Sequence, residues 1–172
     1  MHRAMANCRR DGIMYEEEHA MDTVKSILAA KATGVISVNQ DATVIEALER
    51  MAEHNIGAIL VKDAADDIVG IFSERDFARR IIIKGRSCDQ TKVKEIMTSK
   101  ITYGEPGATV ADCMNLMTTN HFRHLPIKEN GKIIGVISIG DVVKAMIHHQ
   151  EKVISEQAFE IGQNERRSTG AV

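Results

Sequence analysis

Apolar residues recur at the spacing of one helix face in the first half of the chain, at Val44, Ala47, Leu48 and Met51. Thr43 precedes this face and Glu46 follows three residues later, which is the arrangement of a capping box at a helix start. Residues 57–61 and 68–72 come next as short, nearly continuous apolar runs. Such runs are typical of buried strands, and a further helix is predicted to follow them and to end near Gly85.

The same order of elements recurs in the second half. The matching segments are 24–28 with 93–97, 42–44 with 108–110, and 68–76 with 133–141. The second unit is predicted to have a box at Thr109 and Asp112, strands at 125–128 and 133–137, and a helix at 141–147. A unit that cannot bury its own apolar face needs its twin. The sequence therefore predicts an α/β (α+β) fold of two tandem β-α-β-β-α repeats packed into one module.

The segments outside and between the repeats are predicted from composition. Residues 1–20 are expected to form a flexible leader, 21–86 the first repeat, 87–150 the second repeat, and 151–172 a C-terminal helix with a frayed tail. Residues 85–91 show no apolar periodicity and are expected to form an exposed crossover. Helical character continues to Phe159 or Ile161 and then decays, so the last residues are predicted to be frayed.

Charge and cysteine content exclude several classes of partner. The 22 basic and 24 acidic residues give a net charge of −2, which offers no overall field for nucleic acid or an anionic membrane. No apolar run approaches the about 20 residues of a membrane span. Cys8, Cys88 and Cys113 form no C-x-x-C pair, which favours a reducing compartment and a cytoplasmic location. A mitochondrial location is the alternative, because the first ten residues carry arginine and no acid.

A metal site and an enzyme active site are both disfavoured. His148 and His149 are adjacent on a predicted helix, so their side chains diverge by about 100°, and no third ligand accompanies them. No metal is therefore predicted. The chain lacks the Gly-x-Gly-x-x-Gly and Walker lysine patterns, and no nucleophile is paired with a base.

One short motif recurs between a strand and a helix in both repeats. Its residues are Gly70, Ser73 and Asp76 in the first repeat and Gly135, Ser138 and Asp141 in the second. A duplicated unit with this Gly-apolar-x-Ser-x-x-Asp motif resembles the cystathionine-β-synthase (CBS) domain family over about residues 22–150. Segments 123–126 and 136–143 resemble the stand-alone CBS pairs of bacteria and plant organelles. The resemblance implies a disc-like module with pseudo-two-fold symmetry, two clefts for AMP, ADP, ATP, NAD or S-adenosylmethionine, and a homodimer.

The residue types of the motif suit a nucleotide. A carboxylate at a helix start, such as Asp76 or Asp141, can accept hydrogen bonds from both hydroxyls of a ribose. Ser73 and Ser138 mark the strand-to-helix turn, where free N–H groups and the helix dipole favour phosphate. Both Ser-x-x-Asp pairs also satisfy the capping-box pattern, so each could serve only to begin its helix.

By resemblance, each cleft takes residues from both repeats. One cleft is expected to join Ile36, Ser37, Val38, Arg123, His124, Ser138 and Asp141. The other is expected to join Gly57, Ala58, Ser73, Arg75, Asp76, Thr98, Ile101 and Tyr103. Arg123 and His124 would clamp a phosphate, whereas the first repeat has Gly57 and Ala58 at the matching positions. The clefts are therefore predicted to differ, the Arg123 cleft preferring AMP and the Gly57 cleft preferring a bulkier dinucleotide such as NAD.

The function predicted is that of a non-catalytic regulatory protein that senses energy or redox state through AMP, NAD(H), or alternatively ADP or ATP. Three other functions stay open: a ligand-free CBS scaffold for protein–protein association, a regulator that binds S-adenosylmethionine, and a hydrolase or transferase without a recognised motif. Nucleic acid and membrane are not expected as partners, and the sequence does not identify the regulated protein.

Overall fold

The computed structural model describes residues 23–31 and 34–169, with side chains as far as Gly162. The predicted leader, residues 1–20, lies outside the described residues. In chain order the elements are α1 (Val24–Lys31), β1 (Ser37–Asn39), α2 (Val44–Glu53), β2 (Ala58–Lys62), β3 (Ile68–Ser73), α3 (Glu74–Asp76), the π-helical segment η1 (Phe77–Ile82), the 3-10 turn η2 (Val93–Glu95), α4 (Val110–Thr119), β4 (His124–Glu129), β5 (Lys132–Ser138) and α5 (Ile139–Thr169). The predicted mixture of helices and strands is confirmed.

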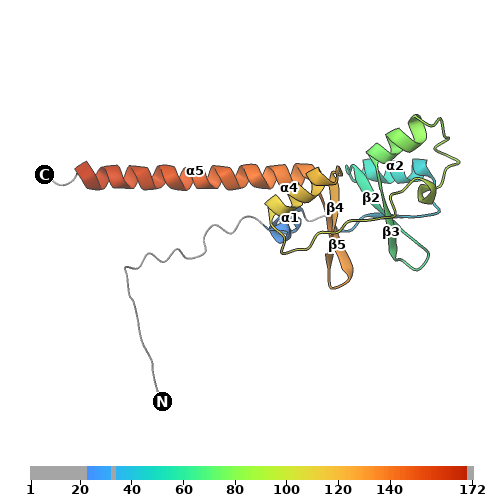
Figure 1. The fold of residues 1–172 in the computed structure, drawn as a ribbon, viewed down its shortest axis with the longest axis horizontal. Coiled ribbons are helices and arrows are strands. Elements are labelled where there is room, and N and C mark those ends of the chain that lie inside the picture. Colours follow the sequence, from blue (N-terminus) through green and yellow to red (C-terminus); the bar gives the residue numbers. More distant parts are fainter. Residues whose placement is uncertain (1–22, 32–33, 170–172) are drawn as a thin grey trace, which may run out of the picture.

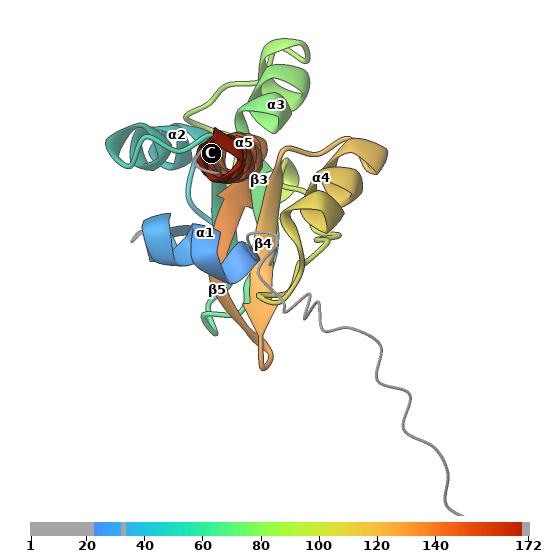
Figure 2. The ribbon, with the colours of Figure 1, turned by 90° about the vertical axis from the view of Figure 1, so that its left-hand side faces the viewer.

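The strands form two small sheets in the middle of the molecule, with α1, α2, α3 and α4 around them (Figure 2). In the first sheet β1 runs parallel to β2, and β2 runs antiparallel to β3. In the second sheet β4 and β5 form an antiparallel hairpin. The place of β1 is taken there by Gly104, whose N–H donates to the Pro126 carbonyl at 2.9 Å and whose carbonyl accepts from Lys128 at 2.9 Å. A Cβ at Gly104 would lie 2.9 Å from terminal methyl groups of Leu125 and Ile127, so a larger residue there would require these two side chains to shift.

Two helices begin at the capping boxes that the sequence predicts. The capping boxes of Thr43 with Glu46 and of Thr109 with Asp112 are both present, and they begin α2 and α4. In each box the threonine hydroxyl accepts from a backbone N–H, while the carboxylate accepts from the threonine N–H. These bonds satisfy donors that a helix start leaves free.

The first helix of each repeat packs in the hydrophobic core of the other repeat. Val24, on α1, is fully buried among residues of the second repeat, and its N–H donates to the Ala108 carbonyl at 3.1 Å. Val93, on η2, is fully buried in the first core, and its N–H donates to the Ala42 carbonyl at 2.9 Å. Each core therefore contains residues from both sides of the predicted boundary at 86/87, and neither repeat closes its core alone.

One expectation about the connections was wrong and the other holds for most of its residues. Residues 85–87, 89 and 90 are exposed, as expected of the crossover, whereas Thr91 is only 7% exposed, its carbonyl accepts from Val44, and Cys88 packs against the first core. The C-terminal helix does not fray after Ile161, since α5 continues to Thr169 and extends well beyond the rest of the module (Figure 1). The segment contains no proline, the residue that most strongly stops a helix.

Candidate functional site

A cavity of about 250 Å3 lies where the first Ser-x-x-Asp motif meets the second repeat, and we call it the Asp76 cleft. Three segments line it: the end of β3 with the helix after it, the extended chain before Gly104, and the turn from α4 into β4. The lining residues are Ile71, Ser73, Arg75, Asp76, Arg79, Arg80, Thr98, Lys100, Ile101, Thr102, His121, Phe122, Arg123, His124 and Pro126.

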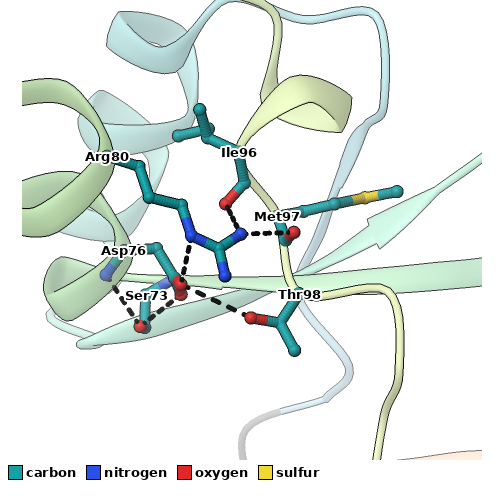
Figure 3. Close-up of polar contacts among 6 residues, drawn as sticks. All are labelled: Ser73, Asp76, Arg80, Ile96, Met97 and Thr98. Atoms are coloured by element: carbon teal, nitrogen blue, oxygen red, sulfur yellow. Dashed lines mark hydrogen bonds and ion pairs between the residues drawn. The ribbon is translucent and has the colours of Figure 1, made fainter. Parts of the chain in front are cut away.

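The Asp76 carboxylate uses its two oxygens differently (Figure 3). Oδ2 accepts from the Ser73 N–H at 3.1 Å and from the Ser73 hydroxyl at 2.6 Å, which is the capping arrangement. Oδ1 accepts a longer bond from the Thr98 hydroxyl at 3.4 Å and lies 3.6 Å from Arg80 Nε. The side chain is 15% exposed. Capping therefore occupies one oxygen and leaves the other with only weak contacts to displace.

Two of the arginines tie the walls of the cleft together. Arg80 donates to the carbonyls of Ile96 and Met97 at 2.7 and 2.8 Å, which fixes the chain before Thr98 against the helix (Figure 3). Arg75 donates to the carbonyl of His121 across the cleft, in the turn between α4 and β4. These bonds join the first repeat to segments of the second.

The charge of the Asp76 cleft is strongly positive. Five cationic side chains line it, those of Arg75, Arg79, Arg80, Lys100 and Arg123, against a single carboxylate. Within the described residues, Arg79, Lys100 and Arg123 enter no ion pair. A cleft lined by one sign of charge concentrates the field and attracts the opposite charge. The arrangement is suited to an anion with more than one charged group.

The lining also includes apolar residues. Ile71, Ile101, Phe122 and Pro126 contribute side chains that offer no charge to a ligand. An aromatic or heterocyclic ring can be buried against such groups, and Phe122 offers a ring face or edge. The cleft therefore has a site for a flat apolar group, a carboxylate for hydroxyls, and cations for an anion.

His124 lies between the two halves of the molecule, and its pKa is lowered to about 4. Burial is the largest cause, and the charges of Arg123 and Lys31 add to it, while Asp141 opposes them. The imidazole is therefore neutral near pH 7. It does not supply a second permanent charge beside Arg123, although it can donate or accept one hydrogen bond.

The second motif is arranged like the first but carries a different partner. Asp141 Oδ2 accepts from the N–H and hydroxyl of Ser138 at 2.7 and 2.8 Å, and it also accepts from Lys31 Nζ at 2.8 Å. Burial raises the pKa of the Asp141 carboxyl, but the hydrogen bonds from Lys31 and Ser138 outweigh burial and lower the pKa below its usual value. This carboxylate is therefore ionised and already paired.

The structure groups the expected site residues differently from the sequence interpretation. Arg123 and His124 line the Asp76 cleft, to which the sequence interpretation did not assign them, and His124 is also paired with Ser138 across β4 and β5. Their part in a cleft at Asp141 stays a prediction. Gly57 does not give open space, because a Cβ there would lie 3.3 Å from His124 Nε2. Ala58 is buried at the start of β2, opposite Ser73 on β3. The contrast drawn between an AMP cleft and an NAD cleft therefore loses its premise, since Arg75 and Arg123 share one cavity.

Two further sets of expected residues lie elsewhere in the described structure. Tyr103 does not line the Asp76 cleft, because its ring lies under Lys128 Nζ at 4.9 Å beside the hairpin turns. Ile36 packs against the first core, Val38 is buried in β1, and Ser37 lines grooves on either side of that strand. That residues 36–38 join Asp141 stays a prediction.

The sequence analysis did not identify four cationic residues that lie near the two Ser-x-x-Asp motifs. Arg79 and Arg80 follow Asp76 by three and four residues, the spacing that brings helix side chains together. Lys31 and Lys100 occupy matching positions when segment 24–28 is aligned with 93–97. These signals were readable, but only the packing of the repeats shows which cation meets which carboxylate. Over the described ranges, no group of three or more histidine, cysteine or acidic side chains could hold a metal ion.

Comparisons with known proteins match most of the described chain. The family model for the CBS domain matches residues 24–83 and 93–148. A CBS domain-containing protein of Arabidopsis thaliana, CBSX3, named as mitochondrial, is 36% identical over an alignment of 155 residues that covers 85% of this chain and 75% of the relative. The CBS domain-containing protein YhcV of Bacillus subtilis is 32% identical over 119 residues, 69% of this chain and 84% of the relative. A crystal structure of a CBS-domain-containing protein from Agrobacterium tumefaciens superposes with a TM-score of 0.71 at 38% identity, covering 77% of this chain and 98% of that one.

Proposed function

Because this chain belongs to the CBS domain family and carries two copies of the domain, we propose that it is a non-catalytic regulatory protein whose Asp76 cleft binds an adenine nucleotide with two or three phosphates. Members of the family are generally regulatory and often bind adenine nucleotides. The observation that supports this ligand is the set of five cations facing one carboxylate in the cleft.

The number of phosphate groups on the proposed ligand is inferred from the charge of the Asp76 cleft. Arg79, Lys100 and Arg123 have no ion-pair partner in the described part of the chain, so an incoming anion would be their first partner. Charge-assisted hydrogen bonds to phosphate are the strong ones, and arginine can make two at once. ADP and ATP offer more such acceptors than AMP. S-adenosylmethionine carries a cationic sulfonium and is disfavoured by the same field.

The size of the cleft favours a mononucleotide over NAD. Small-molecule sites commonly enclose about 300–1,000 Å3, and this cavity of about 250 Å3 lies below that range. A base and one ribose would fill the apolar wall and reach Asp76, with phosphates extending toward the arginines. A second nucleoside would lie outside the cleft.

Ligand binding would regulate the protein through the hydrogen bonds that join the two repeats across the Asp76 cleft. Arg75 joins the first repeat to the turn before β4, and Arg80 joins it to the chain before Thr98. A ligand held between these walls would compete for the same arginines and change how the repeats lie against each other. The surface presented to a regulated protein would then depend on nucleotide concentration.

We also propose that the protein forms a homodimer. Large apolar side chains are exposed at the end of η1 and on α5: Ile82 and the following Ile83 are 62% and 73% exposed, and Ile147 and Ile154 on α5 are 51% and 65% exposed. Apolar patches of this kind on a folded protein commonly mark an interface. Closed pairing of identical surfaces is the commonest way to cover them.

Calorimetric titration with ADP tests the proposed ligand. Asp76→Ala removes the ribose acceptor and should weaken ADP at least about tenfold, as expected for about 1.5–3 kcal/mol of a hydrogen bond to a charged group. Asp112→Ala is the matched control, because Asp112 is also a capping-box carboxylate but lies outside the cleft. It should lower stability by about 1 kcal/mol and leave ADP affinity unchanged.

The same titration separates the alternatives. Equal ADP affinity in Asp76→Ala and wild type would show that Asp76 is only a cap and would contradict the proposal. Wild-type protein that binds none of AMP, ADP, ATP or NAD at millimolar concentration would favour the ligand-free scaffold. Conversion of the added nucleotide to a product during incubation would favour an enzyme.

A further inference from the structure

The second half of α5 projects from the module without tertiary support (Figure 1). The match to the CBS domain ends at residue 148, so this half is an addition to the domain. Every side chain from Ile154 to Ile161 is exposed. In proteins most of the stability of a helix comes from the packing of its apolar face, and short isolated helices are marginal in water. A helix this exposed is expected to pack against a partner.

One face of the projecting helix carries an apolar stripe, which we call the isoleucine stripe. Ile147, Ile154 and Ile161 form it; they are seven residues apart and are 51%, 65% and 60% exposed. Lys152 and Glu156 form an ion pair, and by helical periodicity they lie on the opposite side of the helix. A seven-residue apolar spacing with charges on the other faces is the pattern of a helix that pairs with another helix.

The isoleucine stripe does not face the module. Val142 is fully buried in the second core and fixes the side of α5 that packs there. Val143 lies about 100° further round the helix, in line with the stripe, and it is 41% exposed. The stripe is therefore turned to solvent from the first turns of α5, and a second helix can lie along it without displacing the core.

The residues between the isoleucines favour a second copy of the same helix in parallel orientation. Gln150 and Gln157 occupy the second inward position of each seven-residue repeat. In a parallel pair in register each glutamine meets its own copy, and two amides can donate to and accept from each other. An antiparallel pair would set each glutamine against an isoleucine and leave its amide without that partner, which is costly. Val153 and Ala158 flank the stripe and would add apolar contact across the parallel pair.

We propose that the projecting half of α5 pairs with the same segment of a second copy as a parallel two-stranded coiled coil. This rests on the homodimer proposed above and assigns its interface; it does not depend on which nucleotide is bound. The two modules would lie at the same end of the coil. β-Branched residues at one inward position of the repeat, here isoleucine, are a feature of parallel two-stranded coils.

Light scattering over a dilution series tests the interface. Ile154→Glu combined with Ile161→Glu places charges in the stripe and should weaken the dimer at least about tenfold. Phe159→Glu is the matched control, because Phe159 is 68% exposed, more than either isoleucine, but by helical periodicity lies on the other side of the helix. This variant should dimerise like the wild type.

Disulfide cross-linking tests the orientation. In a chain with Cys8 and Cys88 replaced by serine, the remaining Cys113 is buried and 1% exposed. Gln157→Cys in this background should form a cross-linked dimer on mild oxidation, since the two side chains would face each other in a parallel pair. Phe159→Cys should not.

Other outcomes overturn the inference. A wild type that stays monomeric at tens of micromolar would overturn both the coil and the proposed homodimer. A dimer that the two glutamates do not weaken would leave the homodimer standing and overturn the coil. Equal weakening by Phe159→Glu would place the contact on another face, and no cross-link at position 157, or an equal one at 159, would exclude the parallel pair. Should the double glutamate variant not fold, the cross-linking comparison decides.

Discussion

The lowered pKa of His124 predicts that the free energy of unfolding falls as the pH drops from about 6.5 to about 4. In the folded chain burial, with the charges of Arg123 and Lys31, lowers this pKa from 6.5 to about 4. The unfolded chain therefore binds a proton in this range that the folded chain does not bind. Stability is then fully present above pH 6.5 and is lost as the pH falls toward 4.

The size of the effect follows from the pKa values in the two states. A change in pKa from 6.5 to about 4 corresponds to about 3 kcal/mol at 1.36 kcal/mol for each tenfold change in acidity. This is a large fraction of the about 5–15 kcal/mol of a typical domain. The loss should be visible well above the pH at which most carboxylates titrate.

Urea unfolding at pH 7.5, 6.5, 5.5 and 4.5 measures this dependence. The wild type should lose stability over this range, and His124→Gln, which cannot take up the proton, should lose less. His148→Gln is the matched control, because His148 is exposed on α5, and it should follow the wild type. Parallel curves for wild type and His124→Gln would refute the reasoning, since the slope would then come from other groups.

Two further predictions concern the whole chain. A fragment of residues 87–172 should show no cooperative unfolding by circular dichroism, because it lacks α1 and the part of the second core that α1 supplies; a cooperative transition equal to that of the full chain would contradict the exchange of helices. Replacing Ile147 and Ile154 together by glutamate should convert the homodimer to a monomer in light scattering, while the circular dichroism of the folded chain is kept, since both side chains are more than half exposed. An unchanged dimer mass would place the interface elsewhere, and a monomeric wild type would exclude the dimer.

Local structure could be predicted from the sequence because its causes are local. The helix starts at Thr43 and Thr109 depend on a partner three residues away, and the strands at 58–62 and 124–129 depend on short apolar runs. Duplication strengthened these predictions, since each pattern occurs twice. The strand-to-helix position of Ser73 followed in the same way.

The composition of the cleft could not be predicted because it depends on how the repeats pack. Arg123 directly precedes β4, so its position near that strand could be predicted. Nothing in the local sequence shows which carboxylate it will face. The alignment of Lys31 with Lys100 indicates equivalent positions, yet of these two lysines only Lys31 forms an ion pair with a carboxylate in the described part of the chain. Exchange of the first helices decides both outcomes, and it is a property of the assembled module.

The most direct test of the central claim is a crystal structure of the full chain with ADP. The account predicts ADP in the Asp76 cleft, with the ribose hydroxyls within hydrogen-bond distance of Asp76 Oδ1 and the phosphates against Arg79, Lys100 and Arg123. An Asp76 cleft that stays empty at millimolar ADP, or ADP bound only at Asp141, would contradict the account.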